Sequence, residues 1–448
     1  MMNNLALALA QKYFRVANGE LVVGEVPVKM LASEYGTPAF IYDSGVIDHK
    51  LAVLRHSLPS RFSVCFSVKA NPNQTVLRHF ISRDCGLEIA SAGEFRHALL
   101  AGCDPQRILF AGPGKTEAEL EFVLANGIGE IHLESPLEVR RVAAIARCLG
   151  TRANVAVRVN PAGEGEGGAM RMGGRAAPFG VDEENLDEIL DVLFADSALT
   201  FRGIHLFAGT QILEVATLAE QYRHGIEIAR RVAKRLGHPL HTLDFGGGLG
   251  IPYFAHEKEL DLEQLHTALA VLFAGIESDP AFAGTQFIVE PGRFLIGEAG
   301  IYLARVNDIK VSRGRKFLIL DGGMNHHLAA SGNLGQTIKR NYPVALLNKL
   351  NAPAEETVEV VGPLCTPLDT LARNVILPRA EIGDLFGIFQ SGAYGRTASP
   401  LNFLSHPAPP EVWVAAGHHE LICPRGGSGD VSHDALTARV AHVSWGKN

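Results

Sequence analysis

A repeating unit between residues 61 and 290 restricts the fold more than any other feature of the sequence. Each unit has a short apolar run rich in β-branched residues, a turn, and an amphipathic stretch. The strand-like runs are residues 62–68, 87–90, 107–111, 130–133, 154–159, 201–207, 241–245 and 286–290. Helical stretches separate most of them, most clearly where Leu218, Tyr222 and Ile226 recur at helical spacing. Eight such units favour a parallel (β/α)8 TIM barrel over an open sheet, so we predict an α/β fold of this type.

After Pro291 the pattern changes to short alternating runs separated by turns rich in glycine, proline and asparagine, which indicates a mostly antiparallel β domain. These runs are residues 302–311, 315–320, 359–361, 384–389 and 411–415. A chain of 448 residues also exceeds one ordinary domain. We therefore predict a barrel at 38–295 and a β domain built from 1–37 and 296–448, with a strand from 13–26 joining the latter. From about His418 the chain is polar and glycine-rich, and we expect part of it to be loosely ordered.

Composition excludes several classes of protein. Lys and Arg total 41 against 48 Asp and Glu, a net charge of −7, so a nucleic-acid footprint is not expected. The six cysteines contain no C-x-x-C pair and are too few for a disulfide framework. The Leu-Ala-rich start is typical of a helix rather than a signal peptide, and no apolar run approaches the ~18–20 residues of a membrane span. The adjacent histidine pairs at 326–327 and 418–419 lack helical metal-ligand spacing, so no metal is predicted. We expect a cytoplasmic enzyme.

Residues that could carry chemistry follow the predicted strands, where the active site of a barrel lies. Lys69 comes directly after the first strand, and burial there can lower the pKa of a lysine and make it a nucleophile. A surface lysine at a strand end would look the same. The seventh strand runs into Gly246, Gly247 and Gly248, whose amides could approach a phosphate closely. A tight turn would also explain the three glycines.

Three further strand ends add polar side chains to the same rim. The eighth strand ends in Glu290-Pro-Gly-Arg293, the second carries Glu88, and the sixth carries His205. A nucleophilic lysine, a phosphate cradle, a carboxylate and an imidazole together indicate a Schiff-base enzyme. Two chemistries remain open on spacing alone: an aldolase that forms an imine with its substrate, or an enzyme that uses pyridoxal 5′-phosphate as an electron sink.

Ordered motifs from about residue 38 to residue 414 then point to one family. They are FSVKANP at 66–72, ASAGE at 90–94, His205 with GTQ at 209–211, GGG at 246–248, EPGR at 290–293, GPLC at 362–365 with Asp369, and GAYG at 392–395. With these motifs the chain resembles the pyridoxal-phosphate-dependent decarboxylases of the alanine-racemase-like fold, which include the diaminopimelate, ornithine and arginine decarboxylases.

The resemblance implies a cofactor site at the barrel mouth. Lys69 would hold pyridoxal 5′-phosphate as a Schiff base that exchanges with the substrate amine, and Glu88 and Tyr394 would contact the cofactor. Glu290 would bond the pyridine nitrogen and keep it protonated, which deepens the electron sink. Similar racemases place an arginine there, so Glu290 favours decarboxylation. The phosphate would lie on the amides of Gly246, Gly247, Gly248, Gly292 and Arg293.

The resemblance also implies catalytic residues in the β domain. Cys365 would return a proton to the carbanion left by CO2 loss, and in the family this cysteine comes from the neighbouring subunit. A homodimer with active sites at its interface is therefore expected. Arg293, Thr366 and Asp369 would contact the substrate.

Two positions depart from the family pattern. The residue after the catalytic cysteine, acidic in the diaminopimelate and ornithine enzymes, is Thr366, which loses a charge-assisted contact of ~1.5–3 kcal/mol with a distal ammonium. The family's His-x-Gly-Ser turn begins here with Phe207, and His205 precedes it by two residues. The resemblance makes His205 the nearest candidate for the histidine that stacks on the cofactor and takes part in catalysis, although the usual stacking position is Phe207.

These departures shape the substrate hypotheses. Residues 397–406 resemble the branch of the family that acts on modified amino acids, including aminoacyl groups tethered to carrier proteins. We therefore expect an α-decarboxylase of an amino acid or of a modified or carrier-tethered amino acid. The alternatives are meso-diaminopimelate decarboxylase, which makes L-lysine, and a non-catalytic pyridoxal-phosphate carrier protein. The glycine-rich residues 161–180 are predicted to form a lid or binding loop.

Overall fold

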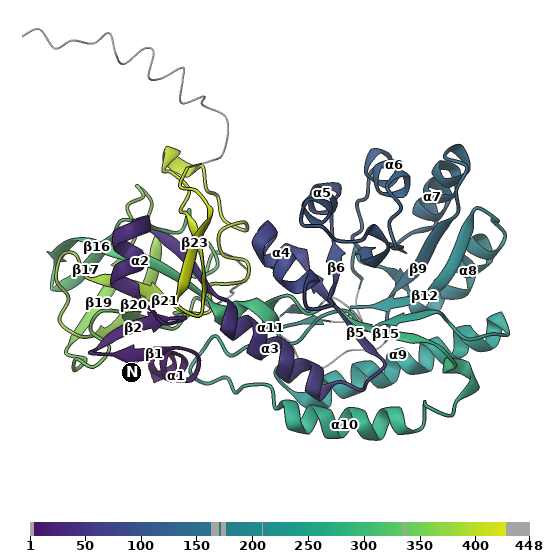
Figure 1. Cartoon of the computed structure of the whole chain (residues 1–448), viewed down its shortest axis with the longest axis horizontal. Coiled ribbons are helices and arrows are strands. Elements are labelled where there is room, and N and C mark those ends of the chain that lie inside the picture. The colour runs from purple at the N-terminus through teal and green to yellow at the C-terminus, as the bar shows by residue number, and fades with distance from the viewer. Residues whose placement is uncertain are drawn as a thin grey trace, which may run out of the picture.

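A closed barrel of eight parallel strands forms one half of the molecule (Figure 1). The computed structural model describes residues 4–162, 170–171, 176–207, 209–334, 336 and 338–426. The barrel strands are β5 (Phe62–Ser67), β6 (Gly86–Ile89), β7 (Ile108–Phe110), β8 (Glu130–Leu133), β9 (Ala153–Asn160), β12 (Leu199–Leu206), β14 (Thr242–Asp244) and β15 (Gln286–Val289). Each pairs in parallel with its neighbours, and β8 with β9 completes the circle. All eight predicted strands and the barrel fold are confirmed.

Helices cover the outside of the barrel, as the alternating pattern predicted (Figure 1). They are α3 (Ser44–Ser57), α4 (Gln74–Ile81), α5 (Ala92–Leu100), α6 (Glu117–Ala125), α7 (Pro136–Cys148), α8 (Leu186–Phe194), α9 (Val215–Leu236) and α10 (Leu262–Ala274). Local sequence sets their starts: Ser91 caps α5, and Thr116 forms a capping box with Glu119 at α6. Gly237, with a φ of 76°, ends α9 in the left-handed conformation.

The second half is a mostly antiparallel β domain, as predicted. Its main path runs β20 (Thr370–Leu377), β19 (Glu356–Val361), β17 (Arg315–Leu320), β16 (Gly300–Ser312), β4 (Ala39–Asp43), β22 (Glu411–Ala415) and β23 (His418–Cys423). Strands β21 (Leu385–Ile388) and β18 (Val344–Leu346) continue from β16. Only the pairs β17–β19 and β4–β22 are parallel among these strands. The short helix α11 (Arg293–Ile296) leads from the barrel into β16.

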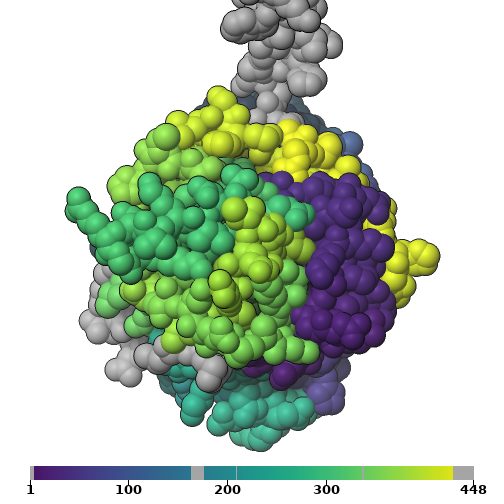
Figure 2. All heavy atoms as spheres, turned by 90° about the vertical axis from the view of Figure 1, so that its left-hand side faces the viewer, coloured from purple at the N-terminus to yellow at the C-terminus, as the bar shows by residue number. Residues whose placement is uncertain are grey.

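The start of the chain packs on this β domain, although not in the way that the sequence suggested. Helix α1 (Asn4–Tyr13) is followed by its own antiparallel sheet of β1 (Arg15–Ala17), β2 (Glu20–Val23) and β3 (Val26–Pro27), and then by α2 (Val28–Tyr35). Residues 13–26 therefore do not add a strand to the large sheet. Their apolar side chains share a core with Ile301, Leu303 and Val412. Figure 2 shows these N-terminal residues, in purple, beside the green and yellow C-terminal ones.

One further expectation from the sequence needs correction. The boundary at residue 38 assigned β4 to the barrel, but β4 lies between β16 and β22 in the second sheet. In the segment from His418 onward, part of which is expected to be loosely ordered, residues 418–423 form β23 against β22, and residues 427–448 lie outside the described residues. Most of the predicted lid at 161–180 lies outside the described residues. Among the helices that the structure describes, none has the length and apolar character needed to cross a membrane.

Candidate active site at the barrel mouth

Lys69 lies in a 3-10 turn (Val68–Ala70) directly after β5, at the carboxyl end of the barrel. Its Nζ contacts both carboxylate oxygens of Glu88, on β6, at 2.7 and 2.9 Å. The Ser67 hydroxyl donates to the same carboxylate, which is buried. The Lys69 side chain is 41% exposed, so its amine is accessible at the barrel mouth while Glu88 holds it from below.

The charge state of Lys69 differs from the expectation. Burial lowers the pKa of Lys69, but the negative charges of Glu88 and Glu290 and the hydroxyl of Tyr394 outweigh burial, and the net pKa is raised above its usual value. The prediction that desolvation would lower this pKa is therefore wrong for the protein alone. The amine must transfer a proton before it can attack a carbonyl, and the Glu88 carboxylate is within hydrogen-bond distance to accept it.

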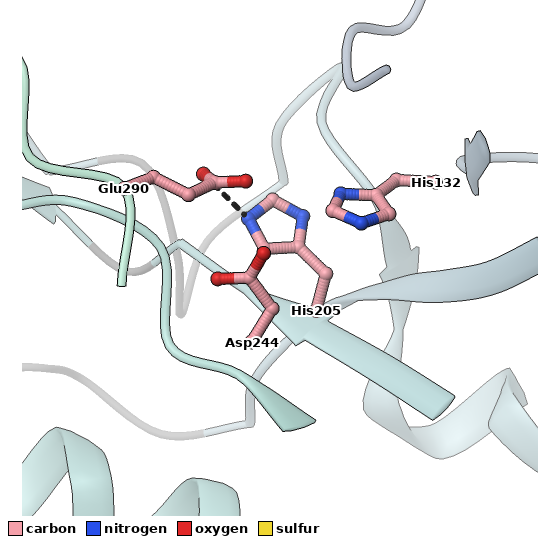
Figure 3. A group of neighbouring side chains, drawn as sticks. All are labelled: His132, His205, Asp244 and Glu290. Atoms are coloured by element: carbon pink, nitrogen blue, oxygen red, sulfur yellow. Dashed lines mark ion pairs between the residues drawn. The ribbon is translucent and has the colours of Figure 1, made fainter. Parts of the chain in front are cut away.

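Glu290 and His205 meet inside the barrel, below the rim. Nε2 of His205, on β12, lies 3.3 Å from Oε2 of Glu290, which follows β15 (Figure 3). Both side chains are buried. Burial, with the neighbouring His132 and Arg158, lowers the pKa of His205 to about 4 despite Glu290, so the imidazole is neutral at pH 7. Burial alone would raise the pKa of Glu290, but contacts with His205, His132 and the Lys69 charge lower it, so the carboxylate is ionised.

Asp244 and His132 complete a group that the sequence did not single out. Oxygens or ring nitrogens of His132, His205, Asp244 and Glu290 all lie within 4.8 Å of one another (Figure 3). Burial and the charge of Glu290 raise the pKa of Asp244 well above its usual range. The available signals were the acidic end of strand β14 and the polar alternation of Glu130 and His132 along β8, which turns both side chains toward the barrel interior.

The glycine run after β14 brings the backbone close to its neighbours. Gly246 and Gly248 have φ values of 67° and 96°, which other residues rarely adopt. A Cβ on Gly247 would lie 2.6 Å from the carbonyl oxygen of Glu290. Gly246 N donates to Asp244 Oδ1 at 2.8 Å, so this amide already has a protein acceptor. A Cβ on Gly292, at the start of α11, would lie 2.9 Å from Cβ of Ala70. Close packing thus requires these glycines independently of any phosphate.

Arg293 joins the barrel to the β domain. Its Nη1 donates to the Tyr253 hydroxyl at 2.9 Å, and its guanidinium lies 4.7 Å from the centre of the Tyr394 ring. Tyr394 belongs to a loop of the β domain, and its amide donates to the Ala70 carbonyl at 3.0 Å. The turn that carries Lys69 is therefore contacted by both domains. Tyr253 was not predicted, because it lies in an irregular loop after β14.

Phe207 and His205 occupy different levels of the site. His205 is buried beside Glu290, whereas Phe207 is half-buried and lies against the glycine run. The guanidinium of Arg158 lies 5.7 Å from the centre of the Phe207 ring and pairs with the Glu134 carboxylate at 2.9 Å. Phe207 is thus the aromatic ring nearer the mouth, and His205 reaches the carboxylate beneath it.

The loop between β19 and β20 carries the residues expected from the β domain. Cys365 is exposed in the single chain. The Thr366 hydroxyl accepts the Leu368 amide at 3.3 Å, within the loop. Asp369 is buried, and its two oxygens accept the Met324 amide at 2.6 Å and the Leu364 amide at 2.9 Å. Asp369 therefore fixes the loop that presents Cys365, rather than offering a free carboxylate.

The histidine pairs at 326–327 and 418–419 lie in the β domain, and three of these histidines contact hydroxyl groups. His326 and His327 are buried in the β domain, where His326 contacts the Tyr302 hydroxyl and His327 the Ser391 hydroxyl. His419 contacts the Tyr35 hydroxyl at 2.7 Å.

The barrel site has the groups that a phosphorylated pyridine aldehyde requires. Lys69 presents an accessible amine, and Glu290 holds a buried, ionised carboxylate whose Oε1 has no hydrogen-bond partner within the described chain. An orphaned buried carboxylate oxygen is costly unless a donor such as a protonated pyridine nitrogen reaches it. The glycine run and the start of α11 lie at the ends of β14 and β15, where barrels commonly bind phosphate. The residues fit the group.

Comparison with known proteins agrees with this fit. The family model described as "Pyridoxal-dependent decarboxylase, pyridoxal binding domain" matches residues 44–297. The L-glutamyl-[BtrI acyl-carrier protein] decarboxylase of Niallia circulans is 36% identical over 91% of this chain and 95% of its own length. The diaminopimelate decarboxylase of Zymomonas mobilis is 33% identical over 94% and 98%. The crystal structure of AQ1208 from Aquifex aeolicus aligns with a TM-score of 0.82 at 28% identity, covering 98% of this chain and 100% of that one.

Proposed function

The chain belongs to the pyridoxal-dependent decarboxylases, and from this premise we propose that its substrate is an amino acid joined to a larger group, with an aminoacyl group tethered to a carrier protein as the leading case. It is a pyridoxal-phosphate-dependent carboxy-lyase. The likeness to relatives that are enzymes extends through the barrel and the β domain, which removes the alternative of a non-catalytic cofactor carrier.

The observation that carries the substrate proposal is the charge of the loop at residues 362–369. Thr366 is neutral, and both oxygens of Asp369 already accept backbone amides. A free diamino acid would leave its distal ammonium without the anionic partner that is worth ~1.5–3 kcal/mol. An acyl linkage at the distal end carries no charge and needs no such partner. The relative at 36% identity acts, by its name, on a glutamyl group held on an acyl-carrier protein.

Lys69, Glu290 and the glycine run would hold the cofactor. Pyridoxal phosphate, when bound, supplies the electron sink that stabilises negative charge on the α-carbon as CO2 leaves. Lys69 would hold the cofactor through its amine, with the aldehyde oxygen leaving as water, and the Glu88 carboxylate is placed to accept a proton from that amine. Glu290, through its unpaired Oε1, would keep the pyridine nitrogen protonated. Amides of Gly247, Gly248 and the Gly292 turn would hold the phosphate, while the Gly246 amide donates to Asp244.

Phe207, rather than His205, is proposed to stack on the cofactor ring. Its position against the glycine run supports this, as does the Arg158 guanidinium near its ring. His205 lies at the level of the Glu290 carboxylate and would act on the cofactor through that residue. Phenylalanine at position 207, where the family has histidine, replaces a titratable ring by an apolar one and keeps a flat stacking surface.

Cys365 is proposed to donate the proton that replaces CO2, at the active site of a second copy of the chain. Its exposure in the single chain supports a role at an interface. The substrate would then lie between the barrel of one subunit and the loop at 362–369 of the other, with Arg293 and Thr366 near it. All six cysteines are free thiols, which supports a reducing compartment such as the cytoplasm.

A second candidate, meso-diaminopimelate decarboxylase, is favoured by the 33% identity to the Zymomonas mobilis enzyme of that name over nearly the whole chain. Its substrate carries a distal ammonium and carboxylate, and the neutral Thr366 is the feature against it. The two candidates therefore differ in whether the distal end of the substrate is charged.

The test is CO2 release across a substrate panel with the purified, cofactor-loaded enzyme. The panel contains meso-diaminopimelate, lysine, ornithine, arginine, glutamate and aspartate, and the glutamyl and aspartyl thioesters of a phosphopantetheinylated carrier protein. We expect the carrier conjugates to give the highest kcat/KM and Lys69→Ala to give none. A kcat/KM for meso-diaminopimelate above that of every conjugate would overturn the proposal in favour of the second candidate.

A further inference from the structure

Four buried side chains meet beneath the rim of the barrel, each from a different strand region. His132 lies on β8, His205 on β12, Asp244 at the end of β14, and Glu290 directly after β15 (Figure 3). Their exposed fractions are 0%, 1%, 1% and 4%. Only Glu290 has a direct role in the proposed chemistry. The other three are polar groups in the interior of a protein, where each needs a partner to offset its lost hydration.

The hydrogen bonds within this group are incomplete in a specific way. Oδ1 of Asp244 accepts the Gly246 amide at 2.8 Å, which fixes the carboxyl group, while its Oδ2 has no partner in the described chain. Oε2 of Glu290 faces Nε2 of His205 at 3.3 Å, within ion-pair distance, while Oε1 of Glu290 and both ring nitrogens of His205 have no hydrogen-bond partner in the described chain. In Figure 3 the carboxyl group of Asp244 lies beside both the Glu290 carboxylate and the His205 ring.

Carboxylate oxygens of Asp244 and Glu290 lie within 4.8 Å of each other in this buried site. At that distance both groups cannot be ionised at low cost, because their negative charges repel. One proton shared by the pair removes the repulsion and creates a hydrogen bond from one carboxyl to the other. Asp244 is the one that keeps the proton, because burial and the charge of Glu290 raise its pKa, whereas Lys69 and the imidazoles favour the ionised form of Glu290.

Further polar contacts lead away from the pair through the barrel interior. The rings of His205 and His132 have their centres 4.4 Å apart, tilted by 31°. Nε2 of His132 lies 3.2 Å from Oε1 of Glu130, whose other oxygen accepts the Thr242 hydroxyl at 3.0 Å. Glu130 therefore fixes His132 from below, and His132 limits how the His205 ring can turn.

We propose that Asp244 is a positioning residue that acts as a protonated hydrogen-bond donor to Glu290, and that with His205 it holds the Glu290 carboxylate ionised and directed at the cofactor's pyridine nitrogen. The inference rests on the proposed cofactor contact of Glu290. The charged and titratable groups that face the pair are Lys69 and Cys65 from β5 and the turn after it, Glu130 and His132 from β8, Arg158 from β9, His205 from β12, and Tyr222 from α9.

The variants Asp244→Asn and Asp244→Leu test whether Glu290 requires a hydrogen-bond donor at position 244. Asparagine can accept the Gly246 amide through Oδ1 and donate to Glu290 through Nδ2, so it reproduces a protonated aspartic acid. Leucine has a similar volume and does neither. We expect the dissociation constant of pyridoxal phosphate to stay within about threefold of wild type in Asp244→Asn and to rise roughly 10- to 100-fold in Asp244→Leu. Asp321→Asn, at a half-buried carboxylate that accepts the Arg305 amide in the β domain, is the matched control and should bind normally.

A spectroscopic readout shows whether Glu290 is the group affected. With pyridoxal phosphate labelled by 15N in its ring, the nitrogen resonance should report a protonated ring in wild type and Asp244→Asn, and move toward the unprotonated position in Asp244→Leu. Equal affinity and resonance in Asp244→Leu and wild type would overturn the proposal. An Asp244→Asn variant that binds pyridoxal phosphate as weakly as Asp244→Leu would also overturn the proposal. The site would then require a negative charge at position 244, and not a hydrogen-bond donor.

A measurement on the wild type covers the case in which Asp244→Leu does not fold. Infrared difference spectra between wild type and Asp244→Asn at pH 7 should contain the carbonyl band of a protonated carboxylic acid in the wild type. Absence of that band overturns the proposal, as does one tightly bound divalent metal per chain, since two carboxylates and two imidazoles could ligate it instead. Failure of the cofactor assignment is distinguishable, because Glu290→Gln would then bind pyridoxal phosphate as tightly as wild type. Failure of the substrate proposal leaves every one of these readouts unchanged.

Discussion

The barrel mouth and the β-domain loop at 362–369 both carry proposed active-site residues, but their surroundings differ sharply. In the barrel site, polar side chains of the same chain contact one another: Lys69 contacts Glu88, His205 contacts Glu290, and Arg293 contacts Tyr253. In the loop, Asp369 serves the backbone and Cys365 is exposed. The barrel site is thus prepared within one chain, whereas the loop presents its reactive group outward. The difference supports the proposal that the cofactor is held by residues of one chain and that the proton is returned by Cys365 of a second copy.

The largest effect should follow from removing the amine at the barrel mouth. Lys69→Ala should abolish the visible absorbance band of the cofactor-loaded protein and lower kcat/KM by more than about 1000-fold, because Lys69 supplies the amine proposed to hold the cofactor. Absorbance spectroscopy and CO2 release measure the two effects. Lys29→Ala, at an exposed lysine, is the control. A wild-type protein that stays colourless with pyridoxal phosphate would contradict the whole barrel assignment.

The second-largest effect should follow from removing the Cys365 thiol in the loop at 362–369. Cys365→Ala should keep the cofactor band but lose normal product formation, with turnover lowered by roughly 100-fold, since proton return from a positioned acid contributes about that much. Absorbance and product analysis distinguish the two steps. Unchanged turnover and product would remove Cys365 from the mechanism.

Mixing the Lys69→Ala and Cys365→Ala variants tests whether each active site is built from two subunits. If each active site combines Lys69 of one subunit with Cys365 of the other, refolded or co-expressed mixtures of Lys69→Ala and Cys365→Ala chains regain activity. Half of the dimers are then mixed, and each mixed dimer has one intact site of two, so about one quarter of wild-type activity is expected. Mixtures no more active than their components would show that both residues act within one chain.

A smaller effect concerns the aromatic ring at the mouth. Phe207→Ala should weaken pyridoxal-phosphate binding by roughly 10-fold through loss of stacking area, and Phe207→His should restore it. Fluorescence titration with the cofactor measures both. Phe201→Ala, near the other end of β12 beside Phe194, is the matched control. Normal binding by Phe207→Ala, with a defect in His205→Ala that matches the loss expected for a stacking residue, would reverse the assignment of the two rings.

Much of this arrangement follows from the sequence because strand ends in a barrel all lie at one rim. Once eight strands are recognised, Lys69, Glu88, Gly246 and Glu290 must converge there, whatever the loops do. β4 was assigned to the wrong domain because all five of its residues are buried. A strand buried on both faces shows no alternation, and followed by α3 it looks like another βα unit.

The remaining features depend on contacts that the sequence does not order. In the sequence Asp369 resembles a substrate carboxylate, but in the structure its oxygens accept the amide of Met324, 45 positions away, and that of Leu364 in the same loop. The Asp244 and Glu290 pairing joins residues 46 positions apart, and only strand adjacency of β14 and β15 brings them together. The raised pKa of Lys69 likewise comes from carboxylates on two other strands, and burial alone would predict the opposite sign.

The smallest expected effect compares a buried imidazole in each half. Burial lowers the pKa of His205 to about 4 in the barrel and that of His327 to about 3 in the β domain. Unfolded histidine titrates near 6.5, so between that pH and the folded pKa the unfolded chain binds more protons. Both residues therefore contribute stability that is complete above about pH 6.5 and is lost as the pH falls toward 4 and 3.

Urea unfolding of the cofactor-free protein measures this loss. Between pH 7 and pH 4 the free energy of unfolding of His327→Gln, which can keep the bond to Ser391, should fall by about 1–3 kcal/mol less than that of wild type. His205→Gln should show a difference of the same sign, smaller because Glu290 partly stabilises the protonated ring. Equal acid sensitivity of His327→Gln and wild type would mean that the ring has the same pKa in the folded and unfolded chain, and a larger effect at His205 would reverse the ranking of the two halves.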